Sequence, residues 1–296
     1  MIAALRRRRD ALAPTTRGML AILLAMFLFV CMDATAKALM QRLPVAEVIW
    51  ARFASQTLLM VLIFLPSLRE RLRTRHLGLQ ISRSAMLFCA TCFFFTSLNF
   101  MELAETVAIF EIAPLLITVL GAIVLREHVG PRRWAAVIVG LIGALIIIRP
   151  GLDVFQLASL LPMAAAFCFA SYQIATRYLG ADEPIWTTML YTTGVGTLLA
   201  SLALPFVWQT PSLGDLGMMT IFGVFGMTGH FCLVYALSQA PASVLAPFNY
   251  AGFVWAALMG FVVFAEVPDA ITLLGASIII GAGVYVWHRE QVREAA

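Results

Sequence analysis

The chain has 296 residues, of which 61% are apolar and 12% are Asp, Glu, Lys or Arg, and its formal net charge is +4. A soluble domain usually carries about 25% charged and about 45–50% apolar residues. A water-soluble globule of this length has too little interior to bury so many apolar side chains. The composition therefore argues against a soluble enzyme, a nucleic-acid-binding protein and a secreted disulfide scaffold. It predicts an all-α polytopic membrane protein.

The apolar segments predict ten membrane-spanning helices. About 20 apolar residues cross the hydrocarbon core as a helix, and charges, prolines and glycines mark where each segment ends. The first segment exceeds 20 residues and nine more follow it, so we interpret it as an uncleaved helix and not a signal peptide. The expected spans are Gly18–Met40, Val45–Leu65, Ser84–Met101, Ala104–Leu125, Arg132–Ile148, Gln156–Tyr178, Ile185–Phe206, Leu213–Leu237, Ala242–Ala265 and Ala270–Trp287.

The basic residues predict how these spans are oriented. With the N-terminus in the cytoplasm, sixteen arginines fall on the cytoplasmic side, and only Arg42 and Arg149 fall outside. This bias follows the positive-inside rule. It predicts a multi-pass protein of the bacterial inner membrane with both termini cytoplasmic, which requires an even number of spans. The cytoplasmic set is Arg6–Arg9, Arg17, Arg69, Arg71, Arg73, Arg75, Arg83, Arg126, Arg132, Arg133, Arg177, Arg289 and Arg293.

The two halves of the chain resemble each other at a nearly constant offset. The segment Asp33–Lys37 matches Gln173–Arg177, 140 residues later, and Ala104–Phe110 matches Ala242–Phe248, 138 residues later. The turn Leu125-Arg-Glu127 recurs as Phe264-Ala-Glu266, and both halves end in glycine-spaced aliphatic helices. We therefore expect a basic N-terminus at 1–17, five-helix repeats at 18–150 and 151–288, and a cytoplasmic tail at 289–296.

Five is an odd number, so the second repeat must enter the membrane upside down relative to the first. Inverted repeats can exchange conformations and so open a central site to one side of the membrane and then to the other. The parity of the repeat therefore predicts alternating access.

These segments resemble the drug/metabolite transporter superfamily, specifically its ten-helix EamA-type members. The resemblance extends from Gly18 to His288, and its most specific part runs from Ala104 through Leu125-Arg-Glu127 to Gly151. Arg126 departs from the family pattern, in which a small residue or glycine is common. Within the superfamily the chain looks nearest to YddG-like amino-acid and metabolite exporters, and S-adenosylmethionine-type carriers are also similar. The resemblance implies a central cavity built by the first, third, fourth, sixth, eighth and ninth helices.

Charged residues inside spans are costly and usually face the protein interior or a cavity. Asp33 and Lys37 are four residues apart on the first span, so they can pair on one helix face. They are either a self-neutralising pair or a contact for a zwitterionic substrate. Arg52 in the second span follows Glu47 by five residues, and for it we favour structural pairing over substrate contact.

Prolines predict kinks beside polar residues in repeat-related spans. Pro114 follows Glu111 by three residues, and Pro247 precedes Asn249 and Tyr250. A proline leaves a backbone carbonyl free to line a cavity, and such interrupted helices indicate a binding site at the membrane midplane. Pro162 is a third expected kink. The remaining candidate binding residues are polar or aromatic positions inside spans, namely Asn99, Tyr172, Gln173, His230 and Trp255.

Together these features predict a secondary transporter that exports amino acids, aromatic or otherwise amphipathic, or related small metabolites. Lys37 is the only lysine and follows no glycine-rich loop, so the chain has no Walker A motif. Energy would come from the gradient of the substrate or from proton exchange.

The expected partners are a small-molecule substrate, the lipid bilayer and coupling protons, without nucleic acid, and the small-residue stripes fix no oligomeric state. We expect no enzymatic activity, no cofactor and no metal site. The alternatives are an uptake or exchange carrier for a metabolite such as S-adenosylmethionine, an intramembrane enzyme using Glu111 and His230, and a pore.

Overall fold

The computed structural model describes residues 14–124, 126, 130–149, 157–179, 183–239, 245 and 248–294. Within these ranges the chain is helical and contains no strand. A helix pairs its N–H and C=O groups internally, so it is the structure that an apolar segment adopts where no water is available.

The first repeat forms five spans, and the fourth of them is interrupted. Its helices are α2 (Pro14–Met40), α3 (Val45–Phe64), α5 (Leu77–Ser97), α6 (Leu103–Phe110) with α7 (Ala113–Val124), and α8 (Pro131–Ile148). A 3-10 turn, Leu65–Ser67, and the short helix α4, Leu68–Arg71, follow α3.

The second repeat also forms five spans. Its helices are α9 (Leu160–Leu179), preceded by a 3-10 turn at Leu157–Ser159, then α10 (Ile185–Val207), α11 (Leu213–Gln239), α13 (Ala251–Phe264) and α14 (Ala270–Glu294). Across the described residues, seven spans have the length and hydropathy of membrane-crossing helices. The other three contain the shorter apolar helices Trp134–Ile148, Ala251–Phe264 and Ala270–Tyr285.

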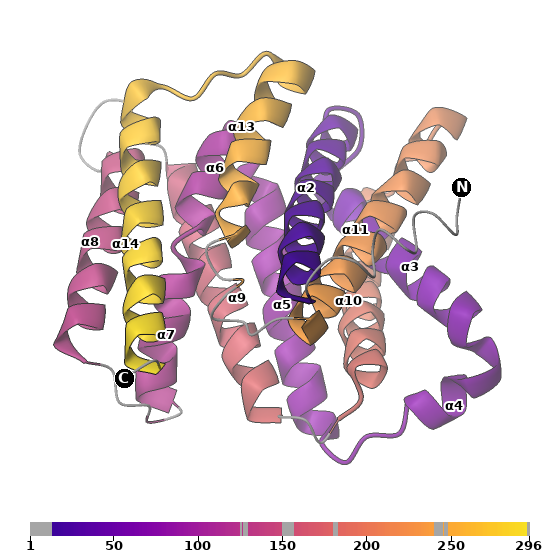
Figure 1. The fold of residues 1–296 in the computed structure, drawn as a ribbon. Coiled ribbons are helices and arrows are strands. Elements are labelled where there is room, and N and C mark those ends of the chain that lie inside the picture. Colours follow the sequence, from indigo (N-terminus) through magenta and orange to yellow (C-terminus); the bar gives the residue numbers. More distant parts are fainter. Residues whose placement is uncertain are drawn as a thin grey trace, which may run out of the picture.

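Equivalent helices of the two repeats run in opposite directions. In Figure 1, α2, α5 and α8 run upward, whereas their counterparts α9, α11 and α14 run downward. The prediction of ten transmembrane helices in two inverted five-helix repeats is confirmed.

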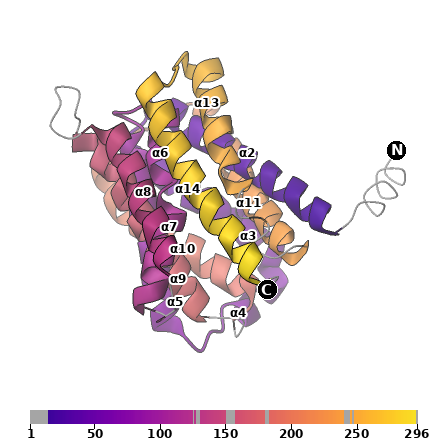
Figure 2. The same cartoon turned by 60° about the vertical axis from the view of Figure 1, so that its left-hand side comes forward.

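Packing between helices follows the same symmetry. The pair α2 and α11 has an equivalent in α9 and α5, and the pair α13 and α2 has an equivalent in α7 and α9. The repeat symmetry exchanges α3 with α10 and α8 with α14, and the two helices of each pair pack against each other. The packing of α8 on α14 is visible in Figure 2. All of these contacts join different repeats, so the two halves form one interlocked bundle.

The ends of the bundle differ in charge. The end that carries α4 presents the exposed side chains of Arg69, Arg73, Arg75 and Arg126, and we call it the basic end. The opposite end carries the loops between α2 and α3, between α5 and α6, between α10 and α11, and between α13 and α14, at the top of Figure 1.

The fourth span breaks at Glu111 and Ile112, directly before Pro114. Pro114 is the second residue of α7, where its missing N–H group leaves no intrahelical bond unmade. The N–H groups of Leu115 and Leu116 donate to Ile112 O at 3.0 and 3.1 Å and so start the new helix. Pro162 stands in the first turn of α9, which runs without interruption, so this proline marks a helix start and not a kink. Pro247 lies outside the described residues.

The third span begins earlier than we expected from its charges. We placed Arg83 in a cytoplasmic loop and began the helix at Ser84, but α5 starts at Leu77 and Arg83 is fully buried within it. Contacts with other helices explain why this charge can lie inside the span. Hydroxyl and carbonyl oxygens of two neighbouring helices accept hydrogen bonds from the Arg83 guanidinium.

Glycines allow α8 and α14 to pack closely. A Cβ atom on Gly275 would lie 2.7 Å from Gly143 O, whereas one on Gly281 of the same helix would contact nothing within 4 Å. We expect Gly275→Ala to lower the free energy of unfolding by about 1–3 kcal/mol through overpacking. Gly281→Ala, the matched control, is expected to raise it by up to about 1 kcal/mol through helix propensity.

Thermal unfolding of the purified protein in detergent measures both changes. Equal melting temperatures for the two variants would contradict the close packing of α8 on α14.

Candidate functional site

A cavity of about 40 Å³ lies inside the bundle. Five helices enclose it, α3, α5, α9, α10 and α11, with the lining residues Arg52, Phe53, Gln56, Met60, Leu87, Tyr172, Thr188, Met189, Thr192, Thr193, Met227 and His230. Thr188 and Met189 belong to the first turns of α10, which begins near the basic end. The cavity therefore occupies the half of the bundle nearer that end.

The helices around this cavity differ from those that the resemblance implied. The second and seventh spans, α3 and α10, contribute most of the lining residues. Among the described residues, none from the first, fourth or ninth span lines it. The candidates Tyr172 and His230 do line it, whereas Arg52 and Gln56 are lining residues that we had not assigned to a site.

Arg52 faces the cavity from α3. Its Nη1 donates to Thr91 Oγ1 at 3.1 Å, and its guanidinium carbon lies 5.2 Å from the centroid of the Phe95 ring. The structural pairing with Glu47 that we favoured is wrong. Glu47 lies at the opposite end of the bundle and accepts a hydrogen bond from Gln209 N through Oε2.

Arg83 joins three helices near the basic end. Its Nη1 donates to Thr176 Oγ1 at 2.9 Å, and its Nη2 donates to Thr188 O at 2.9 Å and to Thr192 Oγ1 at 2.6 Å. The Tyr172 ring centroid lies 4.9 Å from its guanidinium carbon. Arg83 is therefore held by neutral oxygens and an aromatic face, and it fixes α5 against α9 and α10.

Lys37 pairs with a distant residue and not with Asp33. Its Nζ forms an ion pair with Glu266, in the loop between α13 and α14, and donates to Met101 O at 2.9 Å. Glu266 Oε2 also accepts from Leu103 N, the first residue of α6, at 2.9 Å. The Lys37 and Glu266 side chains are only 11% and 19% exposed. This ion pair therefore closes the opposite end of the bundle between the two repeats.

The backbone at Ala265 places Glu266 for this contact. Ala265 ends α13 in the left-handed conformation with φ of 56°, and Arg126 ends the equivalent span with φ of 54°. Glycine adopts this conformation at the lowest cost, whereas Ala265 and Arg126 adopt it although each carries a Cβ atom. The turn directs the Glu266 N–H group to Gly260 O at 3.0 Å.

A second ion pair at this end joins α8 to the loop before α14. Arg149 forms an ion pair with Asp269. The backbone N–H group of Thr272 donates to Asp269 Oδ1 at 2.8 Å. Burial alone would raise the pKa of Asp269, but these hydrogen bonds outweigh it and hold the pKa at about 2. The Asp269 carboxylate is therefore charged at every physiological pH.

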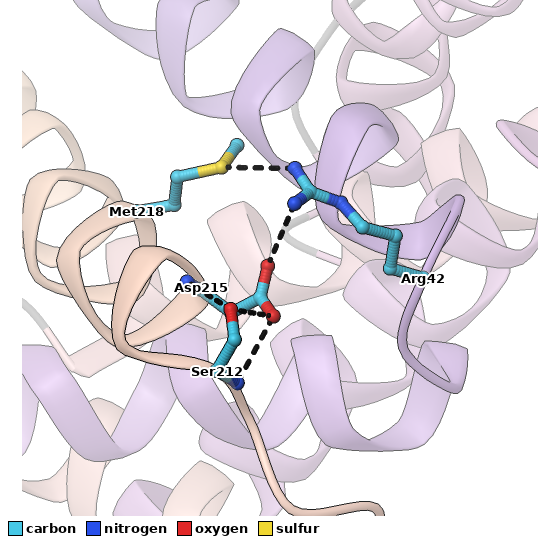
Figure 3. A network of polar contacts seen from close by, with 4 residues as sticks. All are labelled: Arg42, Ser212, Asp215 and Met218. Atoms are coloured by element: carbon cyan, nitrogen blue, oxygen red, sulfur yellow. Dashed lines mark hydrogen bonds and ion pairs between the residues drawn. The ribbon is translucent and has the colours of Figure 1, made fainter.

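Figure 3 shows a further contact between repeats at the same end. Ser212 and Asp215 cap the first turn of α11, with Ser212 Oγ donating to Asp215 Oδ2 at 2.6 Å. Arg42 reaches Asp215 Oδ1 at 3.3 Å and Met218 Sδ at 3.5 Å. The Arg42 side chain is 57% exposed, and ion pairs so exposed contribute little to stability.

Glu111 lies beside the ninth span. Its Oε1 would be 3.2 Å from a Cβ atom on Gly252 of α13, and Tyr250 directly precedes that helix. The Tyr250 hydroxyl lies against Gly283 of α14, where a Cβ atom would overlap it. Asn249 lies in the helical turn before Tyr250. The break in the fourth span thus brings Glu111 against the start of α13, where Glu111 and Tyr250 interact electrostatically.

His230 is held on α11, away from Glu111. Its Nδ1 lies 2.9 Å from Gly226 O, and its ring packs edge-on against Phe29 with centroids 4.9 Å apart. Among the described residues no contact joins His230 to Glu111, so the geometry does not support an acid–base pair between them. No group of three potential metal ligands occurs in this part of the chain.

The other candidates occupy separate places. Asn99 is exposed in the turn that follows α5, and Gln173 is half-buried on α9. Trp255 of α13 packs edge-on against Phe27 with centroids 5.2 Å apart, and its buried Nε1 has no partner among the described residues. None of these three lines the cavity described above.

The fold and the family comparison define the class of protein. The chain matches the EamA-like transporter family over residues 16–149 and 156–287. It therefore belongs to this family of membrane transporters, as its resemblance to the drug/metabolite transporter superfamily implied.

Its curated relatives carry different cargoes. The chain is 31% identical to a riboflavin transporter of Vibrio cholerae over 258 residues, covering 85% of this chain and 86% of the relative. It is 28% identical to an S-adenosylmethionine uptake transporter of Rickettsia bellii, covering 95% and 97%. It is 27% identical to the pseudopaline exporter CntI of Pseudomonas aeruginosa, covering 90% and 94%.

A crystal structure supports the fold independently. It superposes with a TM-score of 0.63 at 19% sequence identity, covering 92% of this chain and 96% of the other. At this identity the likeness shows the shared fold alone.

The Lys37–Glu266 ion pair predicts a measurable equilibrium. Hydrogen bonds to charged groups contribute about 1.5–3 kcal/mol, so we expect Glu266→Gln or Lys37→Met to raise the population of a separated state about tenfold. Spin labels at Gln41 and Val267, on a background without the five native cysteines, report the distance across this end.

The matched control is Asp215→Asn, which removes the exposed Arg42 pair at the same end. It is expected to leave the distance distribution unchanged. If the Glu266→Gln variant and this control give the same distribution as the parent, the Lys37–Glu266 pair does not hold that end closed.

Proposed function

We propose that the protein is a secondary carrier that works by alternating access and exports small amphipathic metabolites, with amino acids as the first class to test. The observation that carries the proposal is the asymmetry of the interior. Lys37–Glu266 joins the repeats at one end, while the cavity lies nearer the other. This asymmetry is the arrangement expected of a carrier closed on one side.

We propose that the basic end faces the cytoplasm of a bacterial inner membrane. Arg69, Arg73, Arg75 and Arg126 gather there, in agreement with the positive-inside rule. The curated relatives named above are bacterial proteins. The structure then corresponds to a state closed to the outside.

Transport is driven by the substrate gradient or by exchange for protons. No glycine-rich loop precedes Lys37, the single lysine of the chain, so ATP hydrolysis is not the source. Asp33 and Glu111 are carboxylates within spans, and exchange between their protonated and ionised forms is a route for proton coupling.

Uptake is the rival direction. The relative from Rickettsia bellii is an uptake transporter, whereas CntI is an exporter. An uncoupled carrier follows whichever substrate gradient is imposed, so the direction is decided by coupling. A pH gradient that drives the substrate opposite to the protons indicates exchange and export, and one that drives it together with the protons indicates uptake.

Proteoliposomes loaded with labelled amino acids test the proposal. We expect at least one amphipathic amino acid to leave vesicles containing the protein faster than vesicles without it. The Asp33→Asn variant is expected to be slower because it changes the charge balance beside Arg52.

An imposed pH gradient serves as the test of proton coupling. Riboflavin and S-adenosylmethionine are included as alternative cargoes, because relatives carry them. If no amino acid moves under any gradient, the amino-acid assignment is wrong. If nothing in the panel moves, the carrier proposal fails.

A further inference from the structure

We infer that Arg52 and Gln56 form a binding site for a carboxylate group, and that the cargo is therefore an organic acid with an apolar or aromatic body. The inference rests on the proposed carrier function, because the cavity is assigned to cargo. It goes further by naming the chemical group that is recognised and the residues that recognise it.

Arg52 has a hydrogen-bond donor that lacks an acceptor among the described residues. Thr91 Oγ1 accepts from its Nη1, while its Nε is buried and lacks a hydrogen-bond partner among the described residues. The Phe53 and Phe95 ring centroids lie 5.6 and 5.2 Å from its guanidinium carbon. The aromatic faces shield the charge from lipid, but they supply no oxygen acceptor.

Among the described acidic side chains, Asp33 has the strongest electrostatic effect on Arg52, but the two side chains are not in direct contact. The two interact electrostatically, and no ion pair joins them in the described part of the chain. At the opposite end, by contrast, a carboxylate contacts each of three cationic side chains directly: Lys37, Arg42 and Arg149. Arg52 is therefore a cationic group at the cavity wall that retains the capacity to bind an anion.

Gln56 adds a second free donor on the same helix face. It follows Arg52 by four residues, so the two side chains lie one turn apart. Its Nε2 is buried and has no partner among the described residues. Buried polar groups are normally hydrogen-bonded, so two orphaned donors lining one cavity indicate a missing acceptor.

A carboxylate satisfies both donors. It accepts through two oxygens and matches the planar fork of arginine. Among the described residues no acidic side chain lines the cavity, which disfavours binding of a cation there. Arg52 is also the single arginine among the described lining residues, so the site matches the one negative charge of a carboxylate better than the higher charge of a phosphate.

Arg83 is unsuited to this role. Its two terminal nitrogens already donate to Thr176, Thr188 and Thr192, and the residue has no exposed surface. Arg83 does not line the cavity, so its Nε, which is unpartnered among the described residues, does not face a ligand bound there.

The rest of the cavity indicates the body of the cargo. Met60, Leu87 and the ring of Tyr172 line it beside Arg52. Met189 and Met227 line it too, and they also line a neighbouring cavity of about 360 Å³ with Ile63, Phe64, Trp186, Thr228 and Phe231. Methionine side chains readily repack. An apolar or aromatic body can therefore displace the two methionines while its carboxylate stays at Arg52.

Matched ligands test the carboxylate directly. The probes are 3-phenylpropionate and phenylalanine, each compared with its amide, which keeps the body but loses the negative charge. We expect the acids to raise the melting temperature of the purified protein and the amides to bind about tenfold or more weakly. Equal binding of acids and amides to the parent protein would overturn the inference, as would failure of both acids to bind.

Variants then locate the site. Arg52→Gln is expected to weaken binding of the acids about tenfold or more while leaving the weak binding of the amides unchanged. Arg52→Lys is expected to fall between, because lysine keeps the charge but not the planar fork. The matched control is Arg42→Gln, an arginine outside the cavity, which is expected to bind like the parent.

Parallel flux measurements separate this inference from the carrier proposal. If the parent protein moves metabolites in vesicles but Arg52→Gln discriminates acids from amides as the parent does, Arg52 is not the carboxylate site and the carrier proposal stands. If no solute moves, the carrier proposal fails even where acids bind at Arg52. Should Arg52→Gln not fold, the comparison of acids with amides on the parent and on Arg52→Lys still decides the matter.

Discussion

Two repeats, each with an odd number of membrane-crossing helices, impose the constraint on which the rest of this structure depends. Five crossings return the chain to the opposite face, so the second repeat has to be inverted. A pseudo-twofold axis then lies in the membrane plane, and the packed pair α2 and α11 has an equivalent in the packed pair α9 and α5. Because the main helix pairs join different repeats, a shift of one pair alters both ends of the bundle together.

Charges are distributed unequally between the two ends of the bundle. At one end Glu266 accepts from both Lys37 and the first N–H group of α6, so three segments from two repeats are joined by one carboxylate. Near the other end Arg83 is held by neutral oxygens. Arg52 lies between them with donors unused. One end of the bundle is closed by Lys37 and Glu266, Arg52 supplies a positive charge inside it, and methionine side chains line the cavity. These three features fit a protein that binds its cargo from one side of the membrane.

Much of the fold follows from local features of the sequence. Hydropathy marks the ten spans, arginines mark one end, and Pro114 marks the break at Glu111, because each depends on residues close in the chain. The partner of Lys37 lies 229 residues away, so spacing along one helix favoured Asp33 instead. Arg83 looked like a loop residue because its acceptors come from other helices. Arg52 and Gln56 were missed as a site because their unused donors become visible only after packing.

Accessibility of single cysteines from each side of the membrane tests the inverted arrangement most directly. Gln41 and Tyr178 are exposed and follow the repeat-related residues Lys37 and Arg177. A membrane-impermeant maleimide added to intact cells is expected to modify Gln41→Cys, and to modify Tyr178→Cys only after the membrane is permeabilised. Modification of both from the same side would contradict the inverted repeats, and alternating access would lose its structural basis.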